Sequence, residues 1–237
     1  MKILSILFML NLLGFSGKPD TGPGVPLHEE SSNRSFTFHD LMEKYETIDF
    51  TGYNKPSKQA YITAINGFLK LKKSGQIKKD ILTIIDFSLS SNEKRLWIID
   101  FNKDQVIYNN YVAHGRNSGN EFAKVFSNKP QSYMSSLGFY VTGNTYHGKH
   151  GLSLRLKGME KGINDNALKR AIVMHSADYV SPNFIKKYGR LGRSYGCPSI
   201  PNEKDYPKVI QTLAEGSCLF IYHHREDYLL KSQLLKR

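Results

Sequence analysis

The apolar and polar positions along the chain follow two different periods, one in the N-terminal part and another from residue 80 onward. Apolar residues recur every three or four positions over 37–45 and 57–73, which predicts two helices, the second of them ended by Gly75. From residue 80 the pattern changes to short apolar runs between polar turns, which is typical of β-strands. The predicted strands cover residues 81–87, 95–100, 105–112, 138–142, 152–156, 171–174 and 217–222.

Two shorter helices are predicted between the later strands. Residues 182–188 form one of them, ended by Gly189, and residues 205–214 form the other, with Pro207 in its first turn. Many short strands, few helices and a long loop over 114–137 predict a mostly-β (α+β) domain, a β-sandwich or barrel with a short N-terminal helical lead-in.

The chain divides into five predicted segments. The first is a signal peptide, and the second is a linker rich in Gly, Pro, Ser and Glu. A helical region leads into the main domain, and a charged, frayed tail follows it. In chain order these segments cover residues 1–16, 17–35, 36–75, 76–225 and 226–237.

The first sixteen residues carry the pattern of a secretory signal. Lys2 precedes the apolar run 3–15, and Gly14 and Ser16 supply the small residues that a signal peptidase requires. The run is shorter than the roughly 20 apolar residues that span a bilayer. A buried N-terminal helix is the alternative, but the Gly/Pro-rich residues that follow favour a signal. We therefore expect an exported protein of the periplasm or cell envelope, with no transmembrane segment after cleavage.

Composition limits the partners. The 237 residues are 40% hydrophobic, and the formal net charge is +12, carried by scattered lysines and arginines. No basic helix, RNA-binding signature or zinc-ligand spacing is present, so we expect neither a nucleic-acid partner nor a metal. A basic surface on an exported protein suits an anionic wall polymer or membrane headgroups, and simple solvation of the surface is the alternative.

The two cysteines lie in different settings. Cys218 belongs to the apolar run 217–222, which predicts a buried thiol. Cys197 lies in a Gly-rich turn before Pro198, which predicts exposure. This difference disfavours a disulfide between them.

His175 and Cys197 are the candidates for chemistry. His175 ends the apolar run 171–174, and a glycine-containing loop returns the chain to Cys197. A thiol beside an imidazole is the minimal nucleophilic cysteine site. A packed histidine and an ordinary turn are the alternative interpretation.

The residues before Cys197 suggest two further roles at such a site, binding of a carboxylate and donation of hydrogen bonds to an oxyanion. Arg190 and Arg193 favour a thiolate and suit a substrate carboxylate. Backbone N–H groups around Tyr195 and Gly196 are candidate oxyanion donors. Solvated arginines are the alternative.

The motif Ser194-x-Gly196-Cys197, after a strand that ends in His175, resembles the catalytic motif of L,D-transpeptidases of the YkuD type, and more closely the murein L,D-transpeptidase catalytic domain branch. The resemblance covers roughly residues 55–225 and rests on a series of blocks in the same order. The blocks are Ile84-Ile85-Asp86-Phe87-Ser88, Val112-Ala113-His114-Gly115-Arg116-Asn117-Ser118-Gly119, Phe126-Ser127-Asn128, Ser135-Ser136-Leu137-Gly138-Phe139-Tyr140, Ser153-Leu154-Arg155-Leu156-Lys157-Gly158 and Gly189-Arg190-x-Gly192-Arg193-Ser194-x-Gly196-Cys197-Pro198.

The resemblance implies a peptidoglycan L,D-transpeptidase that needs no cofactor. Cys197 would form an acyl-thioester on a tetrapeptide stem, and a second stem or another amine would resolve it. His175 would act as base and then acid, with its tautomer fixed by the backbone carbonyl of Ser176. Ser194, His114 and Tyr146 are further candidates for the substrate cleft, and a structural role is the alternative for the last two.

The sequence departs from the family pattern at two places. Tyr195 stands where many members have a second histidine, and Pro198-Ser199 follow the cysteine where many have an arginine. An L,D-carboxypeptidase or endopeptidase, with water as the acceptor, and a non-catalytic wall-binding protein remain alternatives. A papain-type protease is disfavoured because there the cysteine precedes the histidine. A sortase is disfavoured because its gap is longer and an arginine follows its cysteine.

Overall fold

A computed structural model describes residues 35–236, so the predicted signal 1–16 and all but the last residue of the predicted linker 17–35 lie outside the described residues. The residues from Phe36 onward form one compact unit, which includes both N-terminal helices. The helices of the predicted region 36–75 therefore belong to the same compact unit as the sheet. Among the helices of the described residues, none combines the length and apolar character that a membrane span needs.

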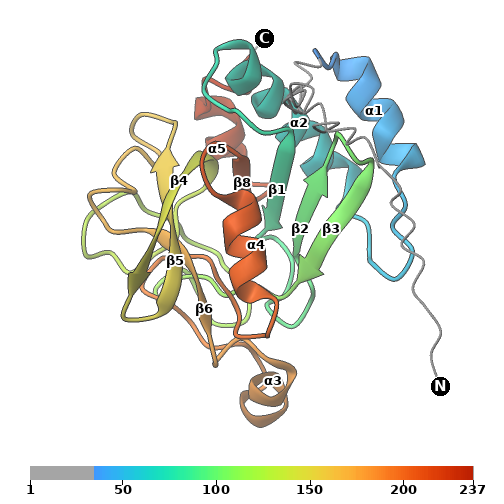
Figure 1. Cartoon of the computed structure of the whole chain (residues 1–237). Coiled ribbons are helices and arrows are strands. Elements are labelled where there is room, and N and C mark those ends of the chain that lie inside the picture. The colour runs from blue at the N-terminus through green and yellow to red at the C-terminus, as the bar shows by residue number, and fades with distance from the viewer. Residues whose placement is uncertain (1–34, 237) are drawn as a thin grey trace, which may run out of the picture. The chain divides into compact units, whose positions relative to one another are not determined.

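The structure is built around one eight-stranded sheet with the strand order β3-β2-β1-β8-β4-β5-β6-β7 (Figure 1). Neighbouring strands are antiparallel except for the pairs β1–β8 and β6–β7. The mostly-β class is therefore confirmed. The strands are β1 (Ile81–Asp86), β2 (Leu96–Asp100), β3 (Gln105–Asn110), β4 (Gly138–Gly148), β5 (Gly151–Gly158), β6 (Val173–Ala177), β7 (Ser199–Pro201) and β8 (Cys218–Tyr222).

The sheet nearly closes on itself through its shortest strand. Beyond β7 lies Ala113, in the segment that follows β3, and it forms an isolated antiparallel bridge with Ser199. The Ala113 N–H donates to the Ser199 carbonyl at 2.8 Å, and the Ser199 N–H donates back at 3.4 Å. The two ends of the strand order therefore meet at Ser199, in agreement with the predicted barrel-like architecture.

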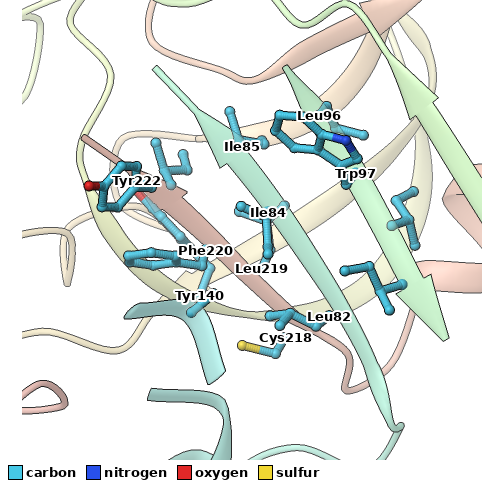
Figure 2. Packing of buried hydrophobic residues seen from close by; sticks show 14 of the residues in the cluster. Leu82, Ile84, Ile85, Leu96, Trp97, Tyr140, Cys218, Leu219, Phe220 and Tyr222 are labelled. Carbon is cyan, nitrogen blue, oxygen red and sulfur yellow. The ribbon is translucent and has the colours of Figure 1, made fainter. Parts of the chain in front are cut away.

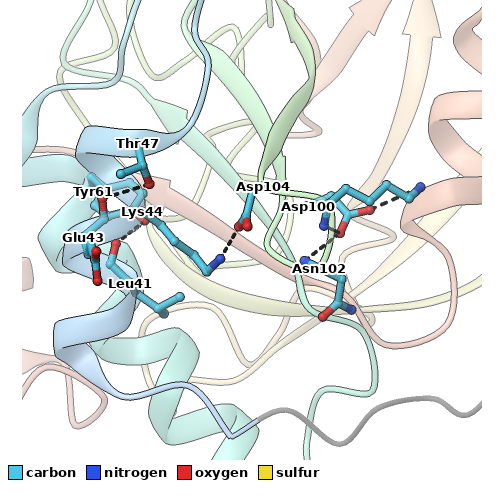
Figure 3. A network of polar contacts seen from close by, with 9 residues as sticks. Leu41, Glu43, Lys44, Thr47, Tyr61, Asp100, Asn102 and Asp104 are labelled. Carbon is cyan, nitrogen blue, oxygen red and sulfur yellow. Dashed lines mark hydrogen bonds and ion pairs between the residues drawn. The ribbon is translucent and has the colours of Figure 1, made fainter.

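Two N-terminal helices, α1 (Phe38–Thr47) and α2 (Lys58–Lys73), pack on the sheet and on each other. Thr37 caps α1 in a capping box with Asp40, and Ser57 caps α2. Figure 3 shows how α1 is attached: Lys44 pairs with Asp104 in the β2–β3 turn, and the Tyr61 hydroxyl of α2 donates to the Leu41 carbonyl.

The core lies between α2 and the central strands β1, β2 and β8. Every residue of these three strands is buried, and Cys218 lies among their apolar side chains with no exposed surface (Figure 2). Phe139 and Phe220 stack with their ring centroids 4.1 Å apart. This packed centre holds the strands that carry the site.

The C-terminal residues are not a frayed tail, contrary to the sequence prediction. Residues Glu226–Lys231 form the helix α5, and Tyr228 is buried. Glu160 accepts hydrogen bonds from the Phe139 N–H at 2.8 Å, from the Tyr228 hydroxyl at 3.2 Å and from the Ser232 hydroxyl. The sequence prediction rested on the charged composition of the segment and did not identify Tyr228 as a buried residue that bonds to Glu160.

The remaining helices are α3 (Pro182–Tyr188) and α4 (Tyr206–Leu213). Gly189 ends α3 in the left-handed conformation with φ 72°, as the sequence predicts. Strand β7 is not predicted from the sequence, because three residues with a proline give no periodic signal. That strand positions the candidate site.

Candidate active site

Strands β6 and β7 bring the candidate histidine and cysteine to one place. They pair in parallel with His175 opposite Ser199, and Cys197 lies two residues before Ser199. Because β7 follows the loop that starts after α3, the register of this short pair fixes where the thiol lies relative to the imidazole. The predicted return of the chain from His175 to Cys197 is therefore present.

Both residues line a cavity of about 950 Å³, a volume within the usual range for ligand sites. Cys197 is half-buried at its wall, and Cys218 is fully buried in the core; both thiols are free. Cys197 is thus the one cysteine of the chain that a solute in the cavity can reach.

The hydrogen bonds of His175 define its tautomer. Nδ1 lies 2.7 Å from the Ser176 carbonyl oxygen, which can only accept, so Nδ1 carries the proton. Nε2 of the neutral ring is then an acceptor, and the Ser199 hydroxyl lies 3.0 Å from it. The contact to Ser176 is the one that the family resemblance implies.

Within residues 35–236, the Cys197 thiol makes no hydrogen bond to the His175 imidazole. Its Sγ lies 3.8 Å from the Ala171 carbonyl oxygen. The backbone N–H of Val173 also faces the sulfur and favours the thiolate. Hydrogen bonds of catalytic groups are often loose before a substrate binds.

Burial is the dominant electrostatic effect on both candidate groups. It raises the pKa of the Cys197 thiol, against the influence of the Val173 N–H, Arg170 and Lys149. Burial also lowers the pKa of His175, and the neighbouring His150 and Lys149 lower it further. Near neutral pH the pair is therefore a neutral thiol beside a neutral imidazole, which is ready to act as a base.

The turn before Cys197 is held by Ser194. Its hydroxyl donates to the Cys197 carbonyl at 2.6 Å and accepts from the Gly196 N–H at 3.0 Å. The Gly196 N–H is therefore already used and is not a free oxyanion donor, contrary to the sequence prediction. Ser194 is only slightly exposed, and it shapes the turn instead of offering its hydroxyl to a substrate. Gly196 has φ 121°, and a Cβ there would lie 2.7 Å from the Met134 carbonyl oxygen.

The cavity wall is strongly cationic. Five basic residues line it and, among the described residues of the lining, there is no Asp or Glu; the five are Arg116, Lys149, Arg170, Arg190 and Arg193. None of the ion pairs found within residues 35–236 includes any of them. An anionic ligand would supply the missing countercharge.

These cations differ in how freely they can meet a ligand. Arg170 donates to the carbonyls of Ser127 and Met134, at 2.7 and 2.6 Å, and so holds the loop beside Cys197. Arg193 donates to Asn120 Oδ1 at 2.7 Å. The only hydrogen bond of the Arg190 side chain among the described residues goes to the adjacent Leu191 carbonyl. Of the two predicted carboxylate ligands, Arg190 is thus the one whose guanidinium makes fewer hydrogen bonds within the protein.

Aromatic side chains form the outer part of the same cavity. Tyr195 is 60% exposed, and its ring lies 4.8 Å from that of Tyr133, with the Arg116 guanidinium 5.5 Å from both rings. Tyr146, as predicted, lines the cavity, and the Arg155 guanidinium covers its ring.

His114 is not a cleft residue. It has no exposed surface, its Nδ1 accepts from Arg95 Nη2 at 2.8 Å, and its Nε2–H faces the Gly119 carbonyl oxygen at 3.4 Å. Burial and Arg95 lower its pKa to about 3. The prediction that it lines the cleft is wrong, because Arg95 draws the ring into the protein.

Sequence reasoning missed several residues of the site, among them His150, Arg170, Tyr179 and Ser199. The His150 ring stacks on that of His175 with centroids 4.4 Å apart. Ser199 could have been found from its place two residues after Cys197, but the other three come from separate segments. Among residues 35–236 no group of three or more His, Cys, Asp or Glu side chains is placed to hold a metal.

Comparison with known proteins gives a family. Residues 53–222 match the family described as L,D-transpeptidase catalytic domain. No curated protein matches the chain significantly.

Solved structures give weaker likenesses. The helical cell shape determining protein Pgp2 from Campylobacter jejuni aligns over 63% of this chain and 49% of its own, with 11% identity and a TM-score of 0.39. The chain therefore spans about half the length of Pgp2. An L,D-transpeptidase from Stackebrandtia nassauensis aligns over 80% of this chain and 77% of its own, with 13% identity and a TM-score of 0.36. L,D-transpeptidase 1 from Mycobacterium tuberculosis aligns over 60% of this chain and 62% of its own, with 9% identity and a TM-score of 0.33.

Proposed function

Since the chain belongs to the L,D-transpeptidase catalytic domain family, we propose that it is a cysteine-dependent peptidoglycan L,D-transpeptidase acting on tetrapeptide stems. The single observation that carries the proposal is the shared cavity, in which a reachable thiol and a neutral imidazole lie on a wall with five cations and no carboxylate. Stem peptides carry carboxylates, which suits that wall.

The first half of the reaction makes a thioester. Cys197 Sγ attacks the carbonyl carbon of the third stem residue, and the thiol proton passes to Nε2 of His175. The C–N bond to the terminal D-residue then breaks, and the imidazolium returns the proton to the leaving amine. The Ser176 carbonyl holds Nδ1–H throughout, so the ring keeps one orientation.

The second half resolves the thioester. The amine of a second stem attacks the acyl carbon, His175 takes its proton, and the Cys197 thiolate leaves and is protonated again. This gives a 3→3 cross-link, or a modified stem when another amine attacks. With water as the acceptor, the same site would act as an L,D-carboxypeptidase or endopeptidase.

Substrate recognition is assigned to the cations that keep free donors. Arg190 and Arg193 would hold a stem carboxylate, and Tyr146 and Tyr195 would contact the rest of the stem. We propose that the backbone N–H of Tyr195, rather than that of Gly196, serves the oxyanion. Peptidoglycan as a partner fits an exported protein of the periplasm or envelope, as the predicted signal at 1–16 requires.

The experiment is incubation of the mature protein with a tetrapeptide-stem muropeptide, followed by mass analysis of the products. Free D-Ala with a cross-linked dimer is expected, and Cys197→Ala should lower turnover by at least about a thousandfold. Cys218→Ala is the control, because it removes a thiol buried in the core and should leave turnover per folded molecule unchanged. Tripeptide without dimer supports the carboxypeptidase. Turnover that survives in Cys197→Ala, or no turnover in the parent protein, contradicts the catalytic proposal and favours a wall-binding protein.

A further inference from the structure

A row of two hydroxyl groups continues from the imidazole of His175 through the buried Ser199 to Tyr179. The Ser199 hydroxyl lies 3.0 Å from Nε2 of His175, and the Tyr179 hydroxyl lies 3.1 Å from the Ser199 hydroxyl. Ser199 has no exposed surface, so no water competes for these contacts. The row therefore starts at the nitrogen that the proposed mechanism uses as base.

The chemistry of its members allows the row to run in either direction. When His175 is neutral, Tyr179 donates to Ser199, and Ser199 donates to Nε2. When His175 is protonated, Nε2–H donates to Ser199, and Ser199 donates to Tyr179. A hydroxyl is both donor and acceptor, so both states of the ring are satisfied without any heavy atom moving.

The surrounding backbone fixes Tyr179 in its place. A Cβ at Gly192 would lie 2.4 Å from the Cβ of Tyr179, so the active-site loop packs directly on this residue. The Gly192 N–H also donates to the Tyr179 carbonyl at 2.9 Å. The loop that carries Cys197 and the outer end of the row are therefore held together.

We propose that Ser199, with Tyr179 behind it, is a positioning residue that satisfies His175 in both of its protonation states during the reaction. The inference rests on the proposed function for the roles of Cys197 and His175. A hydroxyl suits this place because it can accept from Nε2–H as well as donate to Nε2. A donor-only partner would favour the neutral ring and oppose the imidazolium.

Two of the groups that face His175, the neighbouring His150 and Lys149, oppose its charged form. His150 stacks on the ring, and Lys149 lies near it. Cys197 and Tyr179 line the same cavity, and Arg170 faces the thiol. The Ser176 carbonyl alone supports the imidazolium from the Nδ1 side. The Ser199 hydroxyl is therefore the group that compensates Nε2–H.

The test is alkylation of Cys197 by iodoacetamide across the pH range, with the labelled site checked by mass. Ser199→Ala should lower the rate constant at pH 7 about tenfold and move the profile to higher pH, because the imidazolium loses its acceptor. Tyr179→Phe should give a smaller loss of about threefold. The double variant should match Ser199→Ala, because Tyr179 acts through Ser199. Ser217→Ala removes an equally buried hydroxyl in the core and is the control.

A parental alkylation profile in Ser199→Ala, or losses that multiply in the double variant, would overturn the inference. If Ser199→Ala does not fold, two measurements still decide. They are the Tyr179→Phe profile and the ¹⁵N shifts of His175 in the parent protein, where Nε2 must be the unprotonated nitrogen at neutral pH. An Nε2–H tautomer contradicts the proposal. Neither readout uses a muropeptide, so they separate this inference from the proposed activity.

Discussion

The two histidines on either side of β7 are buried almost equally, yet their surroundings differ in kind. His114 is 0% exposed and His175 is 3% exposed. His114 has one partner that can only donate, Arg95, and one that can only accept, the Gly119 carbonyl. His175 has a hydroxyl at Nε2 and a cavity beside it. Burial alone therefore does not separate the proposed catalytic histidine from a structural one. The two differ in whether a partner of the ring can both donate and accept a hydrogen bond.

Exchanging the two imidazoles for amides tests this comparison most strongly. We expect His175→Gln to lower kcat/KM on tetrapeptide stems by about 10² to 10⁴, because the general base is lost. His114→Gln should leave kcat/KM per folded molecule within about threefold but reduce the free energy of unfolding by about 1–3 kcal/mol, because a buried hydrogen-bonded pair is disturbed. The measurements are steady-state kinetics and urea unfolding. Equal loss of activity in both variants would remove the distinction.

The stability of the protein in acid sharpens the same comparison. The pKa of His114 is lowered to about 3, so below about pH 6.5 the unfolded chain binds a proton that the folded protein does not. The stabilisation is present above pH 6.5 and should be lost at roughly 1 to 1.5 kcal/mol per pH unit as the pH falls toward 3. Urea unfolding of the parent protein and His114→Gln at several pH values measures this. Parallel curves for the two proteins would show that His114 titrates freely in the fold.

The smallest effect is expected from the two predicted carboxylate ligands. Arg190→Ala should reduce kcat/KM about tenfold with an unchanged melting temperature, because its guanidinium has one local hydrogen bond. Arg193→Ala should reduce kcat/KM and also lower the melting temperature, since that side chain donates to Arg116, Gly119 and Asn120. Lys157→Ala, an exposed lysine of β5 outside the cavity, is the charge control. If Lys157→Ala has the same effect as Arg190→Ala, the cations act through net charge and not as ligands.

The sequence predicts the fold class well because the central strands β1, β2 and β8 are apolar runs with clear ends. The strands of residues 81–86 and 218–222 are buried throughout, so the apolar run and the strand coincide. The pair of His175 and Cys197 is noticeable in the sequence because His175 directly follows the apolar run 171–174 and Cys197 lies in a Gly-rich turn before Pro198. The family resemblance implies the Ser176 contact.

The rest of the site could not be predicted because it depends on where the chain crosses itself. Nothing near His114 in sequence shows that Arg95, the residue before β2, will hydrogen-bond to its ring. The role of Ser194 depends on a turn that uses its hydroxyl twice. Tyr179 contacts Ser199 because β6 pairs with β7, and His150 stacks on His175 from the β4–β5 turn. These contacts join separate segments of the chain. The helix at 226–231 was missed because a single buried tyrosine, not a periodic pattern, holds it.

The bridge between Ala113 and Ser199 has a consequence for how the candidate site is assembled. Residue 199 closes the sheet with its backbone and supports the imidazole with its side chain. The bridge to Ala113 is a single residue pair beside the shortest strand, so we expect it to open more readily than the continuous pairings of the central strands. Under the proposed function, chemical competence is then coupled to the closure of the sheet. The rate at which Cys197 is alkylated in the intact protein can then report whether the bridge between Ala113 and Ser199 is closed.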